Sequence, residues 1–297
     1  IHAVLSKKYN TKATVGNLNN HIGVPLTLLS FDNETELGIV EMGANHKKEI
    51  EFLCQLAKPD YGYITNFGKA HLEGFGGVKG VIEGKSEMYN YLSENIKLAF
   101  INLDDPIQVE KSKKMKSYSF GVNKEEADVN INSVTANPFV EISFSNLSVK
   151  THLIGLYNAN NINAALTIGK YFGVDDLAIK EALEGYVPEN NRSQLLSKGT
   201  NQIILDAYNA NPSSMAVAIT NFLQLDNANK VMILGDMFEL GEESQREHQT
   251  IVDSLLNSNG VVCHFIGKEF YSNQIHKDYF YFYETFESFS DYLQNTK

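Results

Sequence analysis

Cysteine, tryptophan, proline and positive charge are all scarce in this sequence. It has no tryptophan, two cysteines and six prolines, and its 25 Lys and Arg residues are outnumbered by 36 Asp and Glu residues, for a formal net charge of -11. Two isolated cysteines, Cys54 and Cys263, exclude a disulfide framework or a cysteine zinc site and fit a reducing compartment. A chain this acidic lacks the clustered positive charge that binds nucleic acid or an anionic membrane. We therefore expect a cytoplasmic protein that binds no nucleic acid.

Long hydrophobic runs and an initiator Met are missing as well. The longest apolar runs, such as KLAFINL and GVVCHFIG, are far shorter than the ~20 residues that a membrane helix needs, so we expect no membrane insertion. The chain opens at Ile1 within IHAVLSKKY, which has the pattern of an amphipathic helix but no cap or signal peptide before it. We expect this chain to be a piece of a longer protein, with two domains as the default for 297 residues.

The first part of the chain alternates short β-rich runs with helical patterns. Strands are predicted at ELGIVEM, YGYITNF, KLAFINL and KSYSFGV, and a helix at HKKEIEFLCQLA. This alternation predicts an α/β fold with a mostly parallel sheet and helices on both faces. From Asp128 to about Leu153 the period becomes two, which predicts a small antiparallel meander. Two helices are predicted at residues 158–173 and 175–186.

A polar segment, VPENNRSQ at residues 187–194, is the predicted linker. Beyond it, the strand-like runs QIILDAY, KVMILGDM and VVCHFIG alternate with helical patterns, and YFYFYETF and a final helix follow. This second cycle predicts a smaller, Rossmann-like α/β domain. The two predicted domains are residues 1–187 and residues 188–297.

The stretch GVIEGKSEMY, residues 80–89, contains Gly-Lys-Ser but does not form a nucleotide-binding loop. That signature needs four residues between its first glycine and the Gly-Lys pair, whereas three separate Gly80 from Gly84 and Lys79 stands where the first glycine belongs. Lys85 therefore needs another explanation. One alternative is a surface lysine paired with Glu83 or Glu87, which contributes well under ~1 kcal/mol.

Polar residues gather where the predicted strands end, the place at which open parallel sheets bind ligands. Glu41 ends ELGIVEM, and His71 lies just beyond YGYITNF. Each alone is more often a cap or a solvated side chain, but together a carboxylate and an imidazole at one sheet edge can bind a divalent ion. A protonated Lys85 at about 4 Å from that ion would be repelled by roughly 8 kcal/mol. A lysine that had captured carbon dioxide as a carbamate would instead offer oxygen ligands.

With these residues in place, the sequence resembles the Mur ligases, the ATP-dependent amide-bond-forming enzymes of peptidoglycan synthesis. The resemblance is carried by GNLNNHIGVPLTLL, EMGANHKKEI, ITNFGKAHLEGFG and the spacing from His71 to Lys85. It implies that residues 1–187 are a central ATP-binding domain that uses two magnesium ions. It also implies that Glu41 and His71 are metal ligands and that Lys85 is a carbamylated lysine assisting the metal site, with His71 and Lys85 counted as catalytic. The phosphate loop would then precede Ile1.

The resemblance continues through the second part of the chain. GLYNANNINAA, residues 155–165, matches the segment that contacts adenine, with Asn158 and Asn161 at the contacting positions and Tyr157 in place of the usual His. Arg192 matches the catalytic linker arginine that reaches the terminal phosphate, a task suited to a forked cation. The resemblance places Asp206 on the nucleotide ribose. Purely structural roles stay open for these residues. An Asn near a helix start is often only a cap, and Arg192 could be a surface arginine.

Two long segments, LDAYNANPSSM and ILGDMFELGEESQREH, resemble the family member that joins D-alanyl-D-alanine to UDP-N-acetylmuramoyl-tripeptide. The implied reaction forms an acyl phosphate and ADP, after which the dipeptide amine displaces phosphate. Asn209 and Asn211 would lie near that amine, while Asp236 can be read as a cap of the turn after it. The resemblance implies a monomer that lacks the phosphate loop, the N-terminal domain and a closing strand, so the chain alone is expected to be inactive.

Other interpretations exist, both among related enzymes and outside the enzymes. Folylpolyglutamate and cyanophycin synthetases share the implied architecture, but LDAYNANP stands where their DGAHNP-like segment belongs. The chain could also be a non-catalytic scaffold that keeps the fold, or another ligase of the same superfamily.

Overall fold

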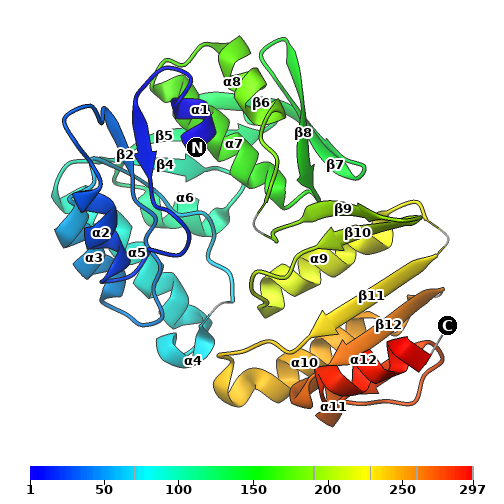
Figure 1. Ribbon diagram of the computed structural model, residues 1–297. Coiled ribbons are helices and arrows are strands. Elements are labelled where there is room, and N and C mark those ends of the chain that lie inside the picture. Colours follow the sequence, from blue (N-terminus) through cyan, green and yellow to red (C-terminus); the bar gives the residue numbers. More distant parts are fainter. Residues whose placement is uncertain (70, 190, 228, 259, 296–297) are drawn as a thin grey trace.

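The N-terminal lobe, taken as the elements up to residue 184, is built around one mixed sheet. The computed structural model describes residues 1–69, 71–189, 191–227, 229–258 and 260–295 (Figure 1). The six-stranded sheet has the order β3-β4-β5-β6-β7-β8. Its strands are β3 (Tyr61–Tyr63), β4 (Leu98–Asn102), β5 (Lys116–Val122), β6 (Val129–Ala136), β7 (Phe139–Phe144) and β8 (Leu147–Ile154). The first four pair in parallel and the last three antiparallel, so the predicted meander continues the parallel sheet.

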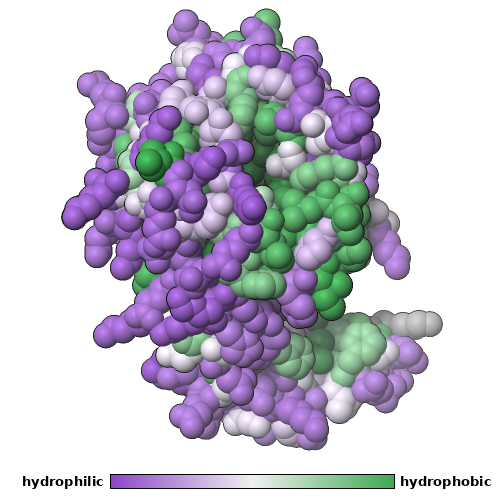
Figure 2. Space-filling view, turned by 90° about the vertical axis from the view of Figure 1, so that its left-hand side faces the viewer, coloured by the Kyte–Doolittle hydropathy of each residue, from purple (hydrophilic) through white to green (hydrophobic). Residues whose placement is uncertain are grey.

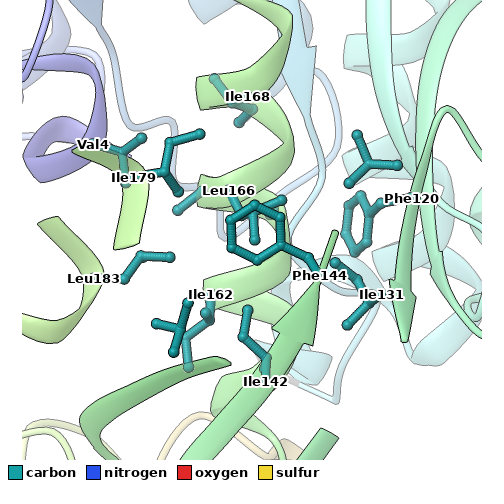
Figure 3. Packing of buried hydrophobic residues seen from close by; sticks show 14 of the residues in the cluster. Val4, Phe120, Ile131, Ile142, Phe144, Ile162, Leu166, Ile168, Ile179 and Leu183 are labelled. Carbon is teal, nitrogen blue, oxygen red and sulfur yellow. The ribbon is translucent and has the colours of Figure 1, made fainter. Parts of the chain in front are cut away.

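Helices surround this sheet, and α7 (Asn158–Tyr171) lies in the middle of the core. The others are α1 (His2–Leu5), α2 (Gly23–Leu29), α3 (Glu49–Ala57), α4 (Leu72–Phe75), α5 (Val78–Glu94), α6 (Pro106–Ser112) and α8 (Asp176–Glu184). Figure 3 shows Phe144 of β7 lying between Leu166 of α7 and Phe120 and Ile131 of the sheet. Small alanines favour the helix and let α7 approach the strands closely. The helices predicted at residues 158–173 and 175–186 are confirmed in position.

The C-terminal lobe, taken as the elements from residue 194 onward, contains a parallel sheet and a separate hairpin. The sheet has the order β11-β12-β13, formed by β11 (Lys230–Gly235), β12 (Val261–Ile266) and β13 (Phe280–Tyr283). The hairpin pairs β9 (Gln194–Lys198) with β10 (Asn201–Leu205). The lobe's helices are α9 (Pro212–Gln224), the 3₁₀ turn η1 (Gly241–Glu243), α10 (Ser244–Ser254), α11 (Lys268–Ser272) and α12 (Phe286–Asn295). The alternation of strands and helices is the α/β arrangement that the sequence predicts.

Two predicted strands pair differently from the expectation. The strand at ELGIVEM is reduced to β2 (Leu37–Ile39), which pairs with β1 (Thr11–Ala13) in a two-stranded sheet of its own. The strand at QIILDAY is β10, which pairs antiparallel with β9, and β9 begins inside the predicted linker. Gly199, with φ of 62°, provides the left-handed turn that folds the chain back. The boundary at residue 187 stays a prediction, and residue 190 of the linker lies outside the described residues.

The hydrophobic packing crosses from one lobe to the other. Leu72 and Phe75 of α4 and Val81 of α5 belong to the same buried cluster as Met215, Ile219 and Met237 of the C-terminal lobe. In Figure 1, α4 lies at the end of the N-terminal lobe that faces η1 and α10. Because α4 contributes its apolar side chains to the buried cluster of the C-terminal lobe, the described residues of the loop before α4 are held between the two lobes.

Apolar side chains also remain at the surface of the N-terminal lobe. Ile22, Leu26 and Leu29 are all exposed, and their spacing places them on one side of α2. Figure 2 views the face of the molecule on which α2 and α3 lie, and it shows hydrophobic surface among the polar side chains there. In the described part of the chain, no helix combines the length and the apolar character needed to cross a membrane.

We expect the C-terminal lobe to lose stability in acid because of His264. This side chain is 5% exposed, its ring is stacked on Tyr281 with centroids 5.2 Å apart, and its Nδ1 lies 3.3 Å from the Tyr283 hydroxyl. Burial lowers the pKa of His264 below its ordinary value. The unfolded chain therefore binds the proton more readily, so the free energy of unfolding should fall as pH drops below about 6.5, the unperturbed histidine pKa.

Urea unfolding of the chain between pH 7.5 and pH 5 measures this effect. His264→Phe should flatten the pH dependence, whereas His276→Phe, at an exposed histidine of the same lobe, controls for the loss of a histidine. An equally steep pH dependence in wild type and His264→Phe would contradict the assignment.

Candidate functional site

Three polar residues from different elements meet where the lobes join. Tyr157, immediately before α7, hydrogen-bonds the Ser193 hydroxyl through its own hydroxyl, which also lies 3.3 Å from Asp206 Oδ2 as a donor. The Ser193 backbone N–H donates to Asp206 Oδ1 at 3.2 Å. Burial raises the pKa of Tyr157 to about 12, so the phenol keeps its proton. Asp206, which directly follows β10, is thereby held in a fixed orientation at the edge of the interlobe region.

Arg192 lies beside this cluster, against an aromatic ring. Its guanidinium carbon is 4.1 Å from the centroid of the Tyr208 ring, and the residue is exposed. Stacking on an aromatic ring restrains the side chain without neutralising its charge. Among the described residues Arg192 forms no ion pair within 4.0 Å, so its charge is available to an anion.

The two asparagines of α7 support each other. Asn158 is 8% exposed; its Nδ2 donates to the Ile154 carbonyl at 2.8 Å, and its Oδ1 accepts from Asn161 Nδ2 at 3.1 Å. The N-cap position belongs to Tyr157, which makes no side-chain cap bond. The alternative that Asn158 is only an N-cap is therefore wrong. Its side-chain amide instead hydrogen-bonds the end of β8 and so stabilises the connection between β8 and α7. Asn161 lies exposed one turn further along the helix.

The predicted amine-side residues have local structural partners. Asn211 is the N-cap of α9 and forms a capping box with Ser214: Asn211 Oδ1 accepts from the Ser214 N–H at 3.0 Å, and Ser214 Oγ accepts from the Asn211 N–H at 3.1 Å. Asn209 Oδ1 accepts from the Ala210 N–H at 2.9 Å. Both side chains therefore shape the turn that leads from β10 into α9, where Asn209 is exposed and Asn211 is partly buried.

Asp236 has a different structural role from the one expected. Its carboxylate accepts from the backbone N–H groups of Glu269 and Phe270, each at 3.0 Å. It therefore caps α11, a helix more than thirty residues away in the sequence, and not the turn that follows it. Gly267 makes this approach possible, because a side chain there would overlap the Asp236 carboxylate, at 2.2 Å from an added Cβ.

A cleft of about 740 Å³ lies between the lobes. One end is polar and includes Tyr157, Asp206 and Asn209, while Met215 and Phe222 of α9 and Ile233 of β11 supply apolar walls. This volume lies within the range of about 300–1,000 Å³ for sites that bind small molecules and cofactors. The cleft thus combines an apolar wall with a small set of convergent polar groups.

The predicted metal ligands Glu41 and His71 have separate partners. Glu41 Oε1 accepts from Asn19 Nδ2 at 2.9 Å, and Glu41 follows β2, outside the main sheet. His71 Nδ1 is hydrogen-bonded to Glu239 of the C-terminal lobe. Within the described residues, no three or more His, Cys, Asp and Glu side chains are grouped to hold a metal ion. The donor types fit a divalent cation, and in this arrangement Glu239 engages His71.

Lys85 pairs with neither Glu83 nor Glu87 and has no carboxylate partner among the described residues, so the interpretation as a lysine paired with a neighbouring glutamate is wrong. Its Nζ donates to the Asn66 carbonyl at 2.8 Å. Glu83 pairs with Lys47, and Glu87 accepts from the backbone N–H groups of Lys48 and Glu51. Burial of the ammonium lowers the pKa of Lys85, which favours the neutral amine that reacts with carbon dioxide.

Sequence reasoning did not find Ser193, Glu239 or Lys69, three residues that link the lobes. Ser193 and Glu239 have left-handed backbones, with φ of 53° and 60°, a conformation that is rare outside glycine and often occurs at functional sites. The sequence carries no signal for this, since neither residue is Gly, Asn or Asp. Lys69 was visible within GKAHLEG, but its contacts depend on the distant α9 and α10.

Comparison with known proteins gives two consecutive family matches. The description "Mur ligase middle domain" matches residues 1–169, and "Mur ligase, glutamate ligase domain" matches residues 191–294. The chain is 35% identical over 251 residues to the UDP-N-acetylmuramoyl-tripeptide–D-alanyl-D-alanine ligase of Bacillus subtilis (strain 168), covering 84% of this chain and 55% of that protein. For the enzyme of the same name from Escherichia coli (strain K12), identity is 33% over 255 residues, covering 83% and 56%.

Two solved structures illustrate the similarity of fold. Crystal structure I of MurF from Acinetobacter baumannii has a TM-score of 0.89 and 29% identity, covering 99% of this chain and 65% of that one. MurF ligase from Thermotoga maritima in complex with ADP has a TM-score of 0.83 and 26% identity, covering 100% and 70%. The chain thus spans a little more than half the length of the two curated relatives named above.

Proposed function

Because this chain belongs to the Mur ligase family, we propose that it forms the nucleotide-binding and amine-binding parts of an ATP-dependent peptide ligase. The proposed reaction joins D-alanyl-D-alanine to UDP-N-acetylmuramoyl-tripeptide, with release of ADP and phosphate. The observation that carries the proposal is the match to relatives of that name across both lobes, at 35% and 33% identity. We further propose a cytoplasmic monomer.

We place the nucleotide at the polar end of the interlobe cleft. Asp206, oriented by Tyr157 and Ser193, would accept hydrogen bonds from the ribose hydroxyls. Asn158 and Asn161 would lie near the adenine, with Asn161 better placed to contact it because Asn161 is exposed whereas Asn158 is buried. The cleft volume and its apolar wall support a bound nucleoside. A related MurF ligase has been solved in complex with ADP.

The catalytic residues of the proposed site have the task of neutralising negative charge. The tripeptide carboxylate and the γ-phosphate are both anionic, so they approach each other only where positive charge is supplied. Arg192, which lies against the Tyr208 ring and forms no ion pair among the described residues, would reach the terminal phosphate and stabilise the transferring group. Closure of the lobes would bring this arginine and the acceptor amine to the acyl group.

Glu41, His71 and Lys85 would hold magnesium, and two ions are proposed. Magnesium, when bound, neutralises phosphate oxygens and orients the transferring group. His71 would first have to leave Glu239. Lys85 would attack carbon dioxide with its neutral amine and lose one proton to solvent, giving a carbamate that offers two oxygens. Its lowered pKa and its position against the Asn66 carbonyl support this role.

The amine substrate would lie at the turn between β10 and α9. Asn211 Oδ1 is engaged in the cap of α9, so its remaining amide N–H groups, together with those of Asn209, would hydrogen-bond the dipeptide. This assignment follows the family pattern, and the local bonds of both side chains support a rigid turn that presents them.

ADP release by the full-length gene product tests the proposed function. With UDP-N-acetylmuramoyl-tripeptide, ATP and magnesium present, we expect sustained ADP release only when D-alanyl-D-alanine is added. Sustained release that depends on a different amine would assign the protein to another ligase of the superfamily. No release from a well-folded protein would favour the non-catalytic scaffold.

A further inference from the structure

The loop that carries His71 touches both lobes. On one side, the Asn66 carbonyl accepts from Lys85 Nζ at 2.8 Å, and Asn66 Oδ1 accepts from the Gly68 N–H at 3.0 Å. On the other side, His71 is bonded to Glu239 of the C-terminal lobe. The described residues of this loop therefore lie between the lysine of the candidate metal site and the second lobe.

Lys69 contacts the second lobe through both its backbone and its side chain. Its N–H donates to Ser213 Oγ at 2.9 Å, and its Nζ donates to Glu247 Oε1 at 3.1 Å. Ser213 lies in the first turn of α9, directly after the Asn209–Pro212 turn, and Glu247 lies in α10. A single residue of the N-terminal lobe thus fixes the position of two helices of the C-terminal lobe.

The burial of Glu247 makes the ion pair between Lys69 and Glu247 important for stability. The Glu247 side chain is 5% exposed, whereas that of Lys69 is 45% exposed. Arg246 offers a second cation, but its nitrogen is 3.6 Å from the same oxygen and also pairs with Glu243. A carboxylate this buried loses much of its hydration, so removal of the lysine leaves a charge that is poorly compensated. The lobes should then separate or rotate to let water reach Glu247.

We propose that Lys69 is a positioning residue that sets the distance between Lys85 and the amine-binding turn before α9. The chain of contacts runs from Lys85 to Asn66, along the loop to Lys69, and from Lys69 to Ser213. Because Asn211 caps the same first turn of α9, a shift of Ser213 shifts the groups proposed to hold the dipeptide. This inference rests on the proposed function. It adds Lys69 to the residues on which binding of the dipeptide depends, through the contact that Lys69 makes between the lobes.

Steady-state kinetics of the full-length gene product test the role of Lys69. Lys69→Met should raise KM for D-alanyl-D-alanine about tenfold, as expected for the loss of a hydrogen bond to a charged group, and should leave KM for ATP nearly unchanged. Lys69→Arg should restore most of the affinity for the dipeptide. Lys97→Met is the matched control, because Lys97 pairs with Asp60 inside the N-terminal lobe. An unchanged KM for the dipeptide, or equal rises for both substrates, would overturn the proposal.

A distance measurement separates this inference from the proposed function. Cysteines introduced at the exposed Glu125 and Asp278 report the separation of the lobes by fluorescence transfer, since the native Cys54 and Cys263 are buried. Lys69→Met should lengthen or broaden that distance, whereas Lys97→Met should not. If the wild-type protein shows no dipeptide-dependent ADP release, the proposed function fails. The distance then still decides whether Lys69 holds the lobes together, and an unaltered distance overturns that role.

Discussion

Replacing Lys85 by alanine is expected to slow ligation by the full-length gene product about 10²–10³-fold, the typical effect of removing one group that stabilises transition-state charge. The surroundings of Lys85 favour the required neutral amine, since burial lowers its pKa and neither neighbouring glutamate pairs with it. The loss should appear mainly in kcat, because the carbamate would act on the transferring phosphate and not on the binding of the amine.

Added short-chain acids should partly restore the activity of Lys85→Ala. A small carboxylate that enters the space left by the side chain supplies the two oxygens of the missing carbamate. Lys79→Ala, which removes an exposed lysine from the same helix α5, should keep wild-type activity and show no response to acids. Full activity in Lys85→Ala would exclude the carbamate, and a loss that no acid relieves would indicate that the ammonium itself, or the fold around it, matters.

Replacing Phe144 by alanine is expected to lower the free energy of unfolding by about 3–5 kcal/mol, the usual cost of truncating a buried Phe. Phe144 is 1% exposed and lies in the cluster that joins the meander to α7 (Figure 3). The strands around it are paired on both sides and α7 is held by its neighbours, so the site has little freedom to collapse onto the cavity.

Denaturant unfolding measures this loss against Phe238→Ala, the same substitution at a side chain that is 74% exposed. That control should change stability by less than about 0.5 kcal/mol, as surface substitutions usually do. Because the two lobes share a buried cluster through α4, the unfolding of Phe144→Ala should be followed with a probe in each lobe. Equal effects of the two substitutions would contradict the assignment of Phe144 to the core.

Much of the architecture was predictable from local patterns. Period-two alternation after Asp128 indicated the meander, and the helical spacing of residues 158–173 indicated α7. The hairpin of β9 and β10 was missed because its first strand starts within a polar segment, where composition favours a linker. Its turn depends on Gly199 in the left-handed region, and a Gly within KGT has no distinctive signal unless the strands on both sides are recognised.

The sequence proposed the members of the candidate site, but it could not propose how they are arranged. Asp206 was singled out from its motif, and the structure adds that Tyr157 and Ser193 orient it. Glu41 and His71 were expected at one sheet edge, yet Glu41 follows a separate two-stranded sheet and His71 is bonded to Glu239. Partners at separations such as Lys69 to Glu247 follow only from the way the lobes pack.

The sequence by itself determined the α/β fold, the family and the set of polar residues that carry the proposed chemistry, because periodicity and motif spacing are local properties of the chain. Tertiary structure alone decided which of these residues meet, since hydrogen bonds between distant segments depend on how the two lobes dock. Burial, which lowers the pKa of Lys85 and leaves Glu247 dependent on Lys69, likewise exists only once both lobes are folded and in contact.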